Sequence, residues 1–178
     1  MSAISIPGIC VSALILAAAA PAFAASTAKA ALKEVVAAGQ KWQPDAVVTH
    51  VSTLFGQPDG KANSWIYTVY SPKAKKSATV TTKDTKVVEV LEVLRNTSTD
   101  PIGDFIDSDQ ATAAAAKAGL TLDKGAKDLM MGLVVGGQAV GKPTLYWTVS
   151  VMRGDNLSGV TLSGKDGTFI KRDDVKFK

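Results

Sequence analysis

Residues 64–70 read SWIYTVY and residues 144–152 read TLYWTVSVM, and these two stretches decide the fold. In both, large apolar side chains occupy every second position, which is the pattern of a strand with one buried face. The residues on the two apolar faces are Trp65, Tyr67, Val69, Leu145, Trp147, Val149 and Val151. We expect these side chains to form the core.

Six further stretches are rich in β-branched and aromatic residues, and turn residues separate them. They are residues 46–55, 77–82, 87–94, 129–135, 158–162 and 168–172. The connections between them are short, which favours antiparallel meanders.

An Ala-rich segment precedes each set of four predicted strands and predicts a helix. The first helix is expected to start from a cap at Ser26 or Thr27 and to run to residue 38, where Gly39 ends it. The second is expected to start with a capping box, in which Asp107 and Gln110 satisfy each other's backbone amides.

The chain repeats weakly at an offset of 80 residues, which superposes Gly39 on Gly119 and the Thr-Val pair at 68–69 on the pair at 148–149. The order of predicted elements repeats as well. We therefore predict an α+β fold of two repeated units packed side by side, each with one N-terminal helix on an antiparallel β-meander of three to four strands. The units are residues 25–95 and 107–178, and residues 96–106 form a polar, turn-rich linker.

Residues 1–24 are typical of a secretory signal peptide. They contain no Asp, Glu, Lys or Arg, run apolar from 11 to 20 and close on Ala22-Phe23-Ala24. We expect cleavage after Ala24, because Pro21 interrupts a run too short and Ala-rich for a typical membrane span. An uncleaved anchor is the alternative. Cleavage would give a secreted or periplasmic protein without a stable membrane span.

Cleavage would also remove Cys10, the only cysteine. The remaining chain would then have no disulfide, thiol nucleophile or thiolate metal site. The formal charge of +4 is scattered along the chain. Such a charge favours weak attraction to anionic surfaces and argues against a nucleic-acid partner.

The pattern of a helix and a meander in tandem resembles PepSY-type domains, small modules of exported bacterial proteins and of peptidase propeptides. The resemblance is carried by residues 107–111 (DSDQA), 145–149 (LYWTV) and 165–170 (KDGTFI), and in the first half by residues 31–39, 65–70 and 83–88. It implies a non-catalytic module that binds or restrains a protein or peptide partner in the cell envelope, such as a peptidase. It transfers no catalytic residue. An exposed edge strand would be the physical means of binding.

Three patterns that could indicate metal or cofactor chemistry have simpler explanations. Residues 136–142 (GGQAVGK) approach a phosphate-binding loop, but Pro143 replaces the hydroxyl residue that holds Mg²⁺. The single histidine, His50, cannot make a zinc site of the usual composition without thiols. The acidic run lacks the spacing of a calcium loop and fits a helix cap and a linker; its members are Asp100, Asp104, Asp107 and Asp109. We expect no metal, no cofactor and no catalysis.

Four aromatic residues are candidates for a binding surface: Trp42, Trp65, Tyr67 and Trp147. A pocket lined by the last three would favour an alternative function, a carrier or sensor that holds a small apolar ligand between helix and sheet. A close-packed core with a bare sheet edge would favour peptide binding. A third possibility, an envelope hydrolase that uses Asp or Glu, requires two carboxylates that converge in a cleft.

Overall fold

The computed structural model describes residues 24–94, 98–123, 129–136 and 144–177. The predicted signal peptide lies outside the described residues except for Ala24, and so does the glycine-rich loop after Gly136. The helices are α1 (Leu32–Trp42) and α2 (Ser108–Lys117). The strands are β1 (Val47–Gly56), β2 (Ser64–Ser71), β3 (Lys76–Lys83), β4 (Lys86–Val93), β5 (Leu129–Gly136), β6 (Thr144–Arg153), β7 (Asn156–Ser163) and β8 (Phe169–Lys176). Each predicted strand is confirmed, with bounds that differ by up to four residues.

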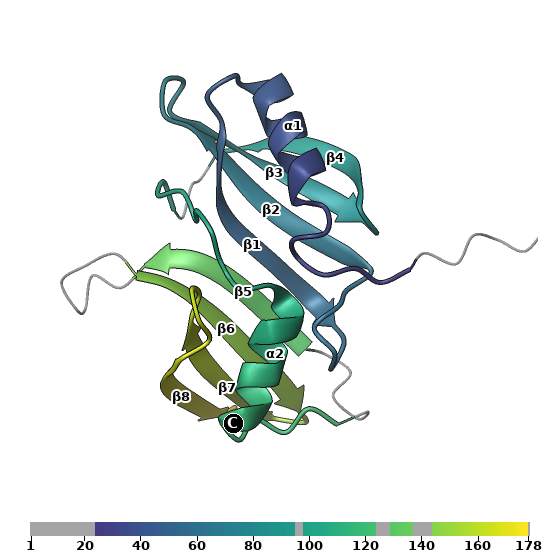
Figure 1. The fold of residues 1–178 in the computed structure, drawn as a ribbon, viewed down its shortest axis with the longest axis vertical. Coiled ribbons are helices and arrows are strands. Elements are labelled where there is room, and N and C mark those ends of the chain that lie inside the picture. Colours follow the sequence, from purple (N-terminus) through teal and green to yellow (C-terminus); the bar gives the residue numbers. More distant parts are fainter. Residues whose placement is uncertain (1–23, 95–97, 124–128, 137–143, 178) are drawn as a thin grey trace, which may run out of the picture.

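All eight strands form one antiparallel sheet in the order β4-β3-β2-β1-β5-β6-β7-β8 (Figure 1). Strand β1 pairs with β2 on one side and with β5 on the other, so that Val51 lies opposite both Tyr67 and Leu133. The predicted fold class of two repeated helix-plus-meander units is therefore wrong. The physical reason is that β1 and β5 complete each other's backbone hydrogen bonds, so that no sheet edge remains between the two halves. The residue boundaries given above for the two parts stay a prediction.

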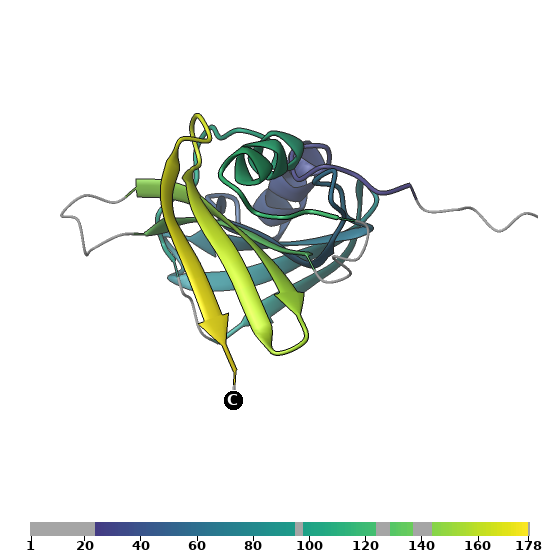
Figure 2. The ribbon, with the colours of Figure 1, turned by 90° about the horizontal axis from the view of Figure 1, so that it is seen from below.

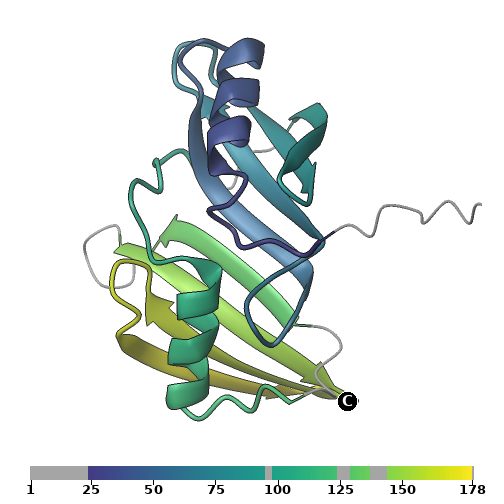
Figure 3. The same cartoon turned by 45° about the vertical axis from the view of Figure 1, so that its right-hand side comes forward.

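Both helices lie on the same face of this sheet (Figures 2 and 3). Helix α1 packs on β1, β3 and β4, whereas α2 packs on β6 and β7. The core lies between the helices and the sheet, and every residue predicted for it is buried, with Trp65, Tyr67 and Trp147 at zero exposure. No helix of the described residues covers the opposite face of the sheet.

The predicted start and end of α1 are wrong. The hydroxyl of Ser26 does not cap the helix, because it donates to the carbonyl oxygen of Asp84 at 2.6 Å. The helix begins only at Leu32, without a side-chain cap, and continues past Gly39 to Trp42. A Cβ on Gly39 would lie 3.2 Å from Val69 Cγ1, so the glycine allows the helix to approach the sheet closely.

The predicted capping box of α2 is confirmed. The Asp107 carboxylate accepts from the backbone of the first turn, and the Gln110 side chain accepts from the Asp107 amide at 3.0 Å. At the other end, Gly119 has a positive φ of 87°, and its amide and that of Leu120 bond back to the last turn. This is the Schellman arrangement, in which glycine ends a helix without strain.

Candidate functional site

The structure places three of the four candidate aromatic residues in the core. The Trp65 indole N–H donates to the Ser26 carbonyl oxygen at 2.9 Å, and that of Trp147 donates to Ile106 at 3.0 Å. The Tyr67 hydroxyl donates to the Ala28 carbonyl oxygen at 2.7 Å, and burial raises the pKa of this hydroxyl above its usual value. These side chains are buried with satisfied polar atoms, so they offer no surface to a partner.

Trp42 is the fourth candidate and lies half-buried at the end of α1, apart from the other three. Its side chain packs against the edge of the core. Hydrogen bonds from Lys76 and from Trp42 lower the pKa of Glu92 on β4. Trp42 therefore ties α1 to the first edge of the sheet.

Two members of the acidic run, Asp104 and Asp107, have structural roles. Asp107 accepts from the Lys29 amide at 2.9 Å as well as capping α2. Asp104 pairs with the Lys29 ammonium at 3.0 Å, and this hydrogen bond lowers the pKa of Asp104. Among the described residues no group of three or more His, Cys, Asp or Glu side chains is placed to hold a metal ion.

His50 lies half-buried on β1, opposite Thr68 and Val134. Its side chain is on the face of the sheet without helices, and burial lowers its pKa. No carboxylate or hydroxyl hydrogen bond to it is formed within the described residues.

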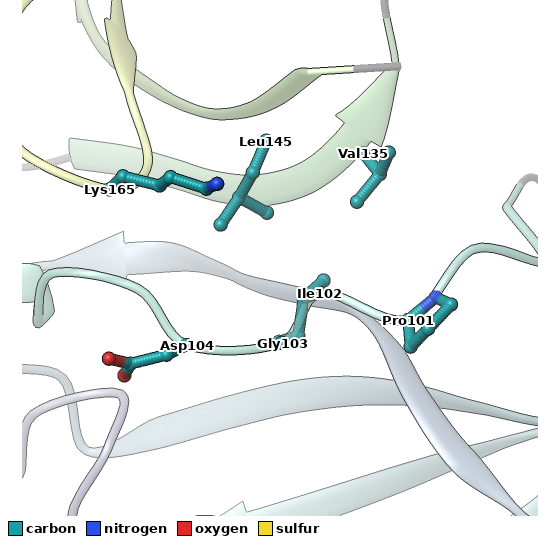
Figure 4. Close-up of a pocket in the computed structure, with 7 residues that line it drawn as sticks. All are labelled: Pro101, Ile102, Gly103, Asp104, Val135, Leu145 and Lys165. Carbon is teal, nitrogen blue, oxygen red and sulfur yellow. The ribbon is translucent and has the colours of Figure 1, made fainter.

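A hollow of about 600 Å³ lies between residues 101–104 and the strands β5 and β6 (Figure 4). Ile102, Val135 and Leu145 form its apolar wall. The Lys165 side chain reaches along it toward Leu145, while the Asp104 carboxylate turns away. The volume suits a small ligand, but the hollow is wide open to solvent and contains no pair of converging carboxylates.

The first edge of the sheet is β4, which pairs with β3 and with no other strand of the described residues. Its apolar side chains reach solvent on both faces; Val88 is 53% exposed and Leu91 is 55% exposed. Its acidic residues are Glu89 and Glu92, and Glu92 is held by Lys76 at 2.8 Å. An exposed apolar edge strand is a template for pairing with another chain.

The second edge is β8, every residue of which is exposed. Its centre is the charged run from Lys171 to Asp174, in which Lys171 pairs with Asp173 and Arg172 pairs with Asp174. Hydrogen bonds from Arg172 and Ser158 lower the pKa of Asp174. Apolar residues flank the charges at both ends: Phe169, Ile170, Val175 and Phe177.

Sequence reasoning predicted β4 and β8 as strands but did not identify them as the edges of the sheet. A signal was present, because residues 87–94 (VVEVLEVL) place apolar residues on both faces and so lack the alternation of a half-buried strand. Such a run fits a strand buried on both faces as well as an exposed edge. Only the pairing order of the sheet decides between them.

The chain matches no protein-family model and no curated protein. It is similar in structure to a putative lipoprotein from Clostridium difficile 630, with a TM-score of 0.55 and 13% sequence identity over 81% of this chain and 92% of that one. At this identity the likeness shows a shared fold alone. A search of the described residues for a helix long and apolar enough to cross a membrane finds none.

Proposed function

We propose that the protein is an exported, non-catalytic binding module that accepts an extended segment of a protein partner along the β4 edge. The observation that carries the proposal is the exposure of Val88 and Leu91 on a strand that has a neighbour on one side only. The free backbone groups of such an edge supply affinity, and its alternating side chains supply selectivity.

The chemistry of β4 defines the segment that fits it. Leu91 and Val93 lie on the helix-free face together with Glu89, because they pair with Thr79, Ser77 and Thr81. Glu92 is already neutralised by Lys76, whereas no ion pair to Glu89 is formed by the described residues. A suitable segment is extended, has apolar side chains at alternate positions and carries one Lys or Arg opposite Glu89.

The signal-peptide pattern of residues 1–24 supports a place in the envelope or outside the cell. The resemblance to PepSY-type modules supports a peptidase as the partner. Binding of an extended segment at a sheet edge would restrain a peptidase without any chemistry by this chain. Trp65, Tyr67 and Trp147 are fully buried, which is consistent with a function that uses the sheet edge and not these aromatic side chains.

The test is affinity capture from envelope extract with the exported form of the protein and two variants. Leu91→Lys puts a charge on the edge, and Leu54→Lys is the matched control, because Leu54 is 56% exposed on β1 away from both edges. We expect the unmodified protein and Leu54→Lys to capture the same partner. We expect Leu91→Lys to capture at least tenfold less of that partner. Equal recovery with Leu91→Lys would refute binding at β4.

A recovered peptidase should then lose activity toward a protein substrate when the unmodified protein is added, and keep it when Leu91→Lys is added.

The hollow beside Leu145 favours a second candidate function, a carrier of a small ligand. Capture of no specific protein, together with a large thermal shift from a small molecule that Leu145→Asp abolishes, would support the carrier and exclude the edge proposal.

A further inference from the structure

We propose that β8 pairs antiparallel with β8 of a second copy of this chain, which joins the two sheets edge to edge into a symmetric dimer. This inference uses the edge opposite to β4 and does not depend on the proposed function. It rests on the backbone direction of β8 and on the order of its charges.

The backbone direction follows from the ladder between β7 and β8. The amide of Phe177 donates to the Asp155 carbonyl oxygen at 2.8 Å, and the register is constant from Asn156 opposite Lys176 to Thr161 opposite Lys171. Hydrogen-bonded and non-hydrogen-bonded pairs alternate along an antiparallel ladder. Residues 171, 173 and 175 therefore turn their backbone groups toward β7, and residues 172, 174 and 176 turn theirs outward, where another strand can bind them.

Symmetry limits how two copies can meet. A two-fold axis perpendicular to the sheet keeps both helix-covered faces on the same side, so each residue must meet one of its own face. The axis then passes beside a residue, and we place it at Asp173. Residue 172 of each copy then lies opposite residue 174 of the other, and their outward backbone groups bond reciprocally. This register keeps the irregular pairing near Ile170 out of the central pairs.

The charges fit this register. Arg172 meets Asp174 of the second copy on the helix-covered face, and the symmetry repeats the pair. The two Asp173 carboxylates at the axis are each held by a Lys171 ammonium, at 2.8 Å within their own strand. In a single copy Arg172 pairs with Asp174 of its own strand at 2.9 Å. In the dimer each of these residues pairs instead with its counterpart in the other copy, so every charge keeps a partner of opposite sign.

Edge strands often carry charged residues that prevent pairing with another chain, and this is the alternative explanation for the charged run of β8. A run of one sign would repel a second copy. Here two basic residues precede two acidic ones, and the register with its axis at Asp173 sets Arg172 of each copy opposite Asp174 of the other, with Asp173 opposite Asp173. On β4, Lys86 lies on the helix-free face and Glu92 on the helix-covered face, so no register that keeps the faces aligned sets these two residues opposite each other. The dimer would therefore leave a free β4 edge at each end.

The test is sedimentation equilibrium of the exported protein and two charge variants, Arg172→Asp and Asp174→Arg. We expect the unmodified protein to dimerise as its concentration rises. Each variant alone would set like charges opposite each other and dimerise at least tenfold more weakly. A mixture of the two variants restores both pairs between copies, so we expect it to dimerise like the unmodified protein, which a misfolded variant could not do.

Glu89→Arg, on the other edge, is the matched control and should dimerise normally. An unmodified protein that stays monomeric, variants that dimerise as tightly as it does, or a mixture that fails to associate would each overturn the proposal. Open-ended association beyond a dimer would also overturn it. Because Arg172→Asp and Asp174→Arg leave β4 intact, their capture of a β4 partner tests the proposed function separately.

A second measurement checks the register. Asp173→Cys places two sulfurs across the axis in a non-hydrogen-bonded pair, where Cα atoms about 4.5 Å apart allow a disulfide. In a chain from which Cys10 has been removed, we expect it to oxidise to a dimer at least tenfold faster than Glu89→Cys. Equal rates for the two variants would mean random collision and would overturn the register.

Discussion

At the scale of single residues, the fold depends on two indoles and one phenol that bond to the backbone just before each helix. Trp65 and Tyr67 bond to Ser26 and Ala28, and Trp147 bonds to Ile106. The period-two pattern was sufficient to predict that these side chains are buried. It could not show that they are unavailable for binding, because a large amphipathic ring serves a core and an interface equally well.

Trp147→Phe tests the role of the indole N–H. The change leaves the Ile106 carbonyl oxygen without its donor and leaves a space beside Phe105, whose ring packs edge-on against the indole. We expect the free energy of unfolding in urea to fall by about 2 kcal/mol. Trp42→Phe is the control and should cost less than Trp147→Phe, since Trp42 is half-buried and Trp147 is fully buried. Equal losses of unfolding free energy in the two variants would contradict the role of the Trp147 indole N–H.

His50 makes stability depend on pH. Burial favours its neutral form and lowers its pKa in the fold below the value of 6.5 that it has when exposed. As the pH falls below 6.5, the unfolded chain takes up a proton before the folded chain does, so the free energy of unfolding decreases. Urea titrations from about pH 7.5 to about pH 5 should show this decrease, and His50→Gln should remove it. An unchanged pH profile in the variant would contradict the assignment.

At the scale of elements, the sequence predicts strands better than helix ends. The strands carry their own pattern of β-branched residues and turns, and the start of α2 carries its cap in the side chains of Asp107 and Gln110. The start of α1 was mispredicted because Ser26 is used by Asp84, 58 residues further along the chain. A cap can be predicted only when its partner is local.

The turn before β2 packs on the start of α2 through Gly60, and this contact is testable. Gly60 has φ +80°, and a Cβ there would collide with the backbone of Ser108 and Asp109. Gly154 has φ +55° with nothing within 4 Å, so Gly154→Ala measures the backbone strain alone. We expect Gly60→Ala to lower the free energy of unfolding by at least about 2 kcal/mol more than Gly154→Ala does. Similar losses would mean that the turn does not contact α2.

At the scale of the whole molecule, two of the connections that join the halves into one body are the following. The first is the pairing of β1 with β5. The second is the segment before α1, in which the amides of Ala28 and Lys29 donate to Ser108 and Asp107 at the start of α2. Neither could be predicted, because the sequence pattern of a strand shows which face is buried but not which distant strand lies beside it.

The continuous sheet also determines where binding can occur. With β1 and β5 paired, the strands left with a free edge are β4 and β8. Both carry exposed apolar residues; the proposed dimer uses the charges of β8, and the proposed partner of β4 carries a basic residue opposite Glu89. The proposed dimer and the proposed partner thus occupy opposite ends of one sheet.

Amide hydrogen exchange, followed residue by residue by NMR, tests this arrangement most directly. If the sheet is continuous, hydrogen-bonded amides of β1 and β5 are among the slowest to exchange in the protein, because only global unfolding exposes them. The outward amides of β4 then exchange fast. Fast exchange along β1 and β5, with slower exchange inside each half, would show that the halves separate and would contradict the single sheet.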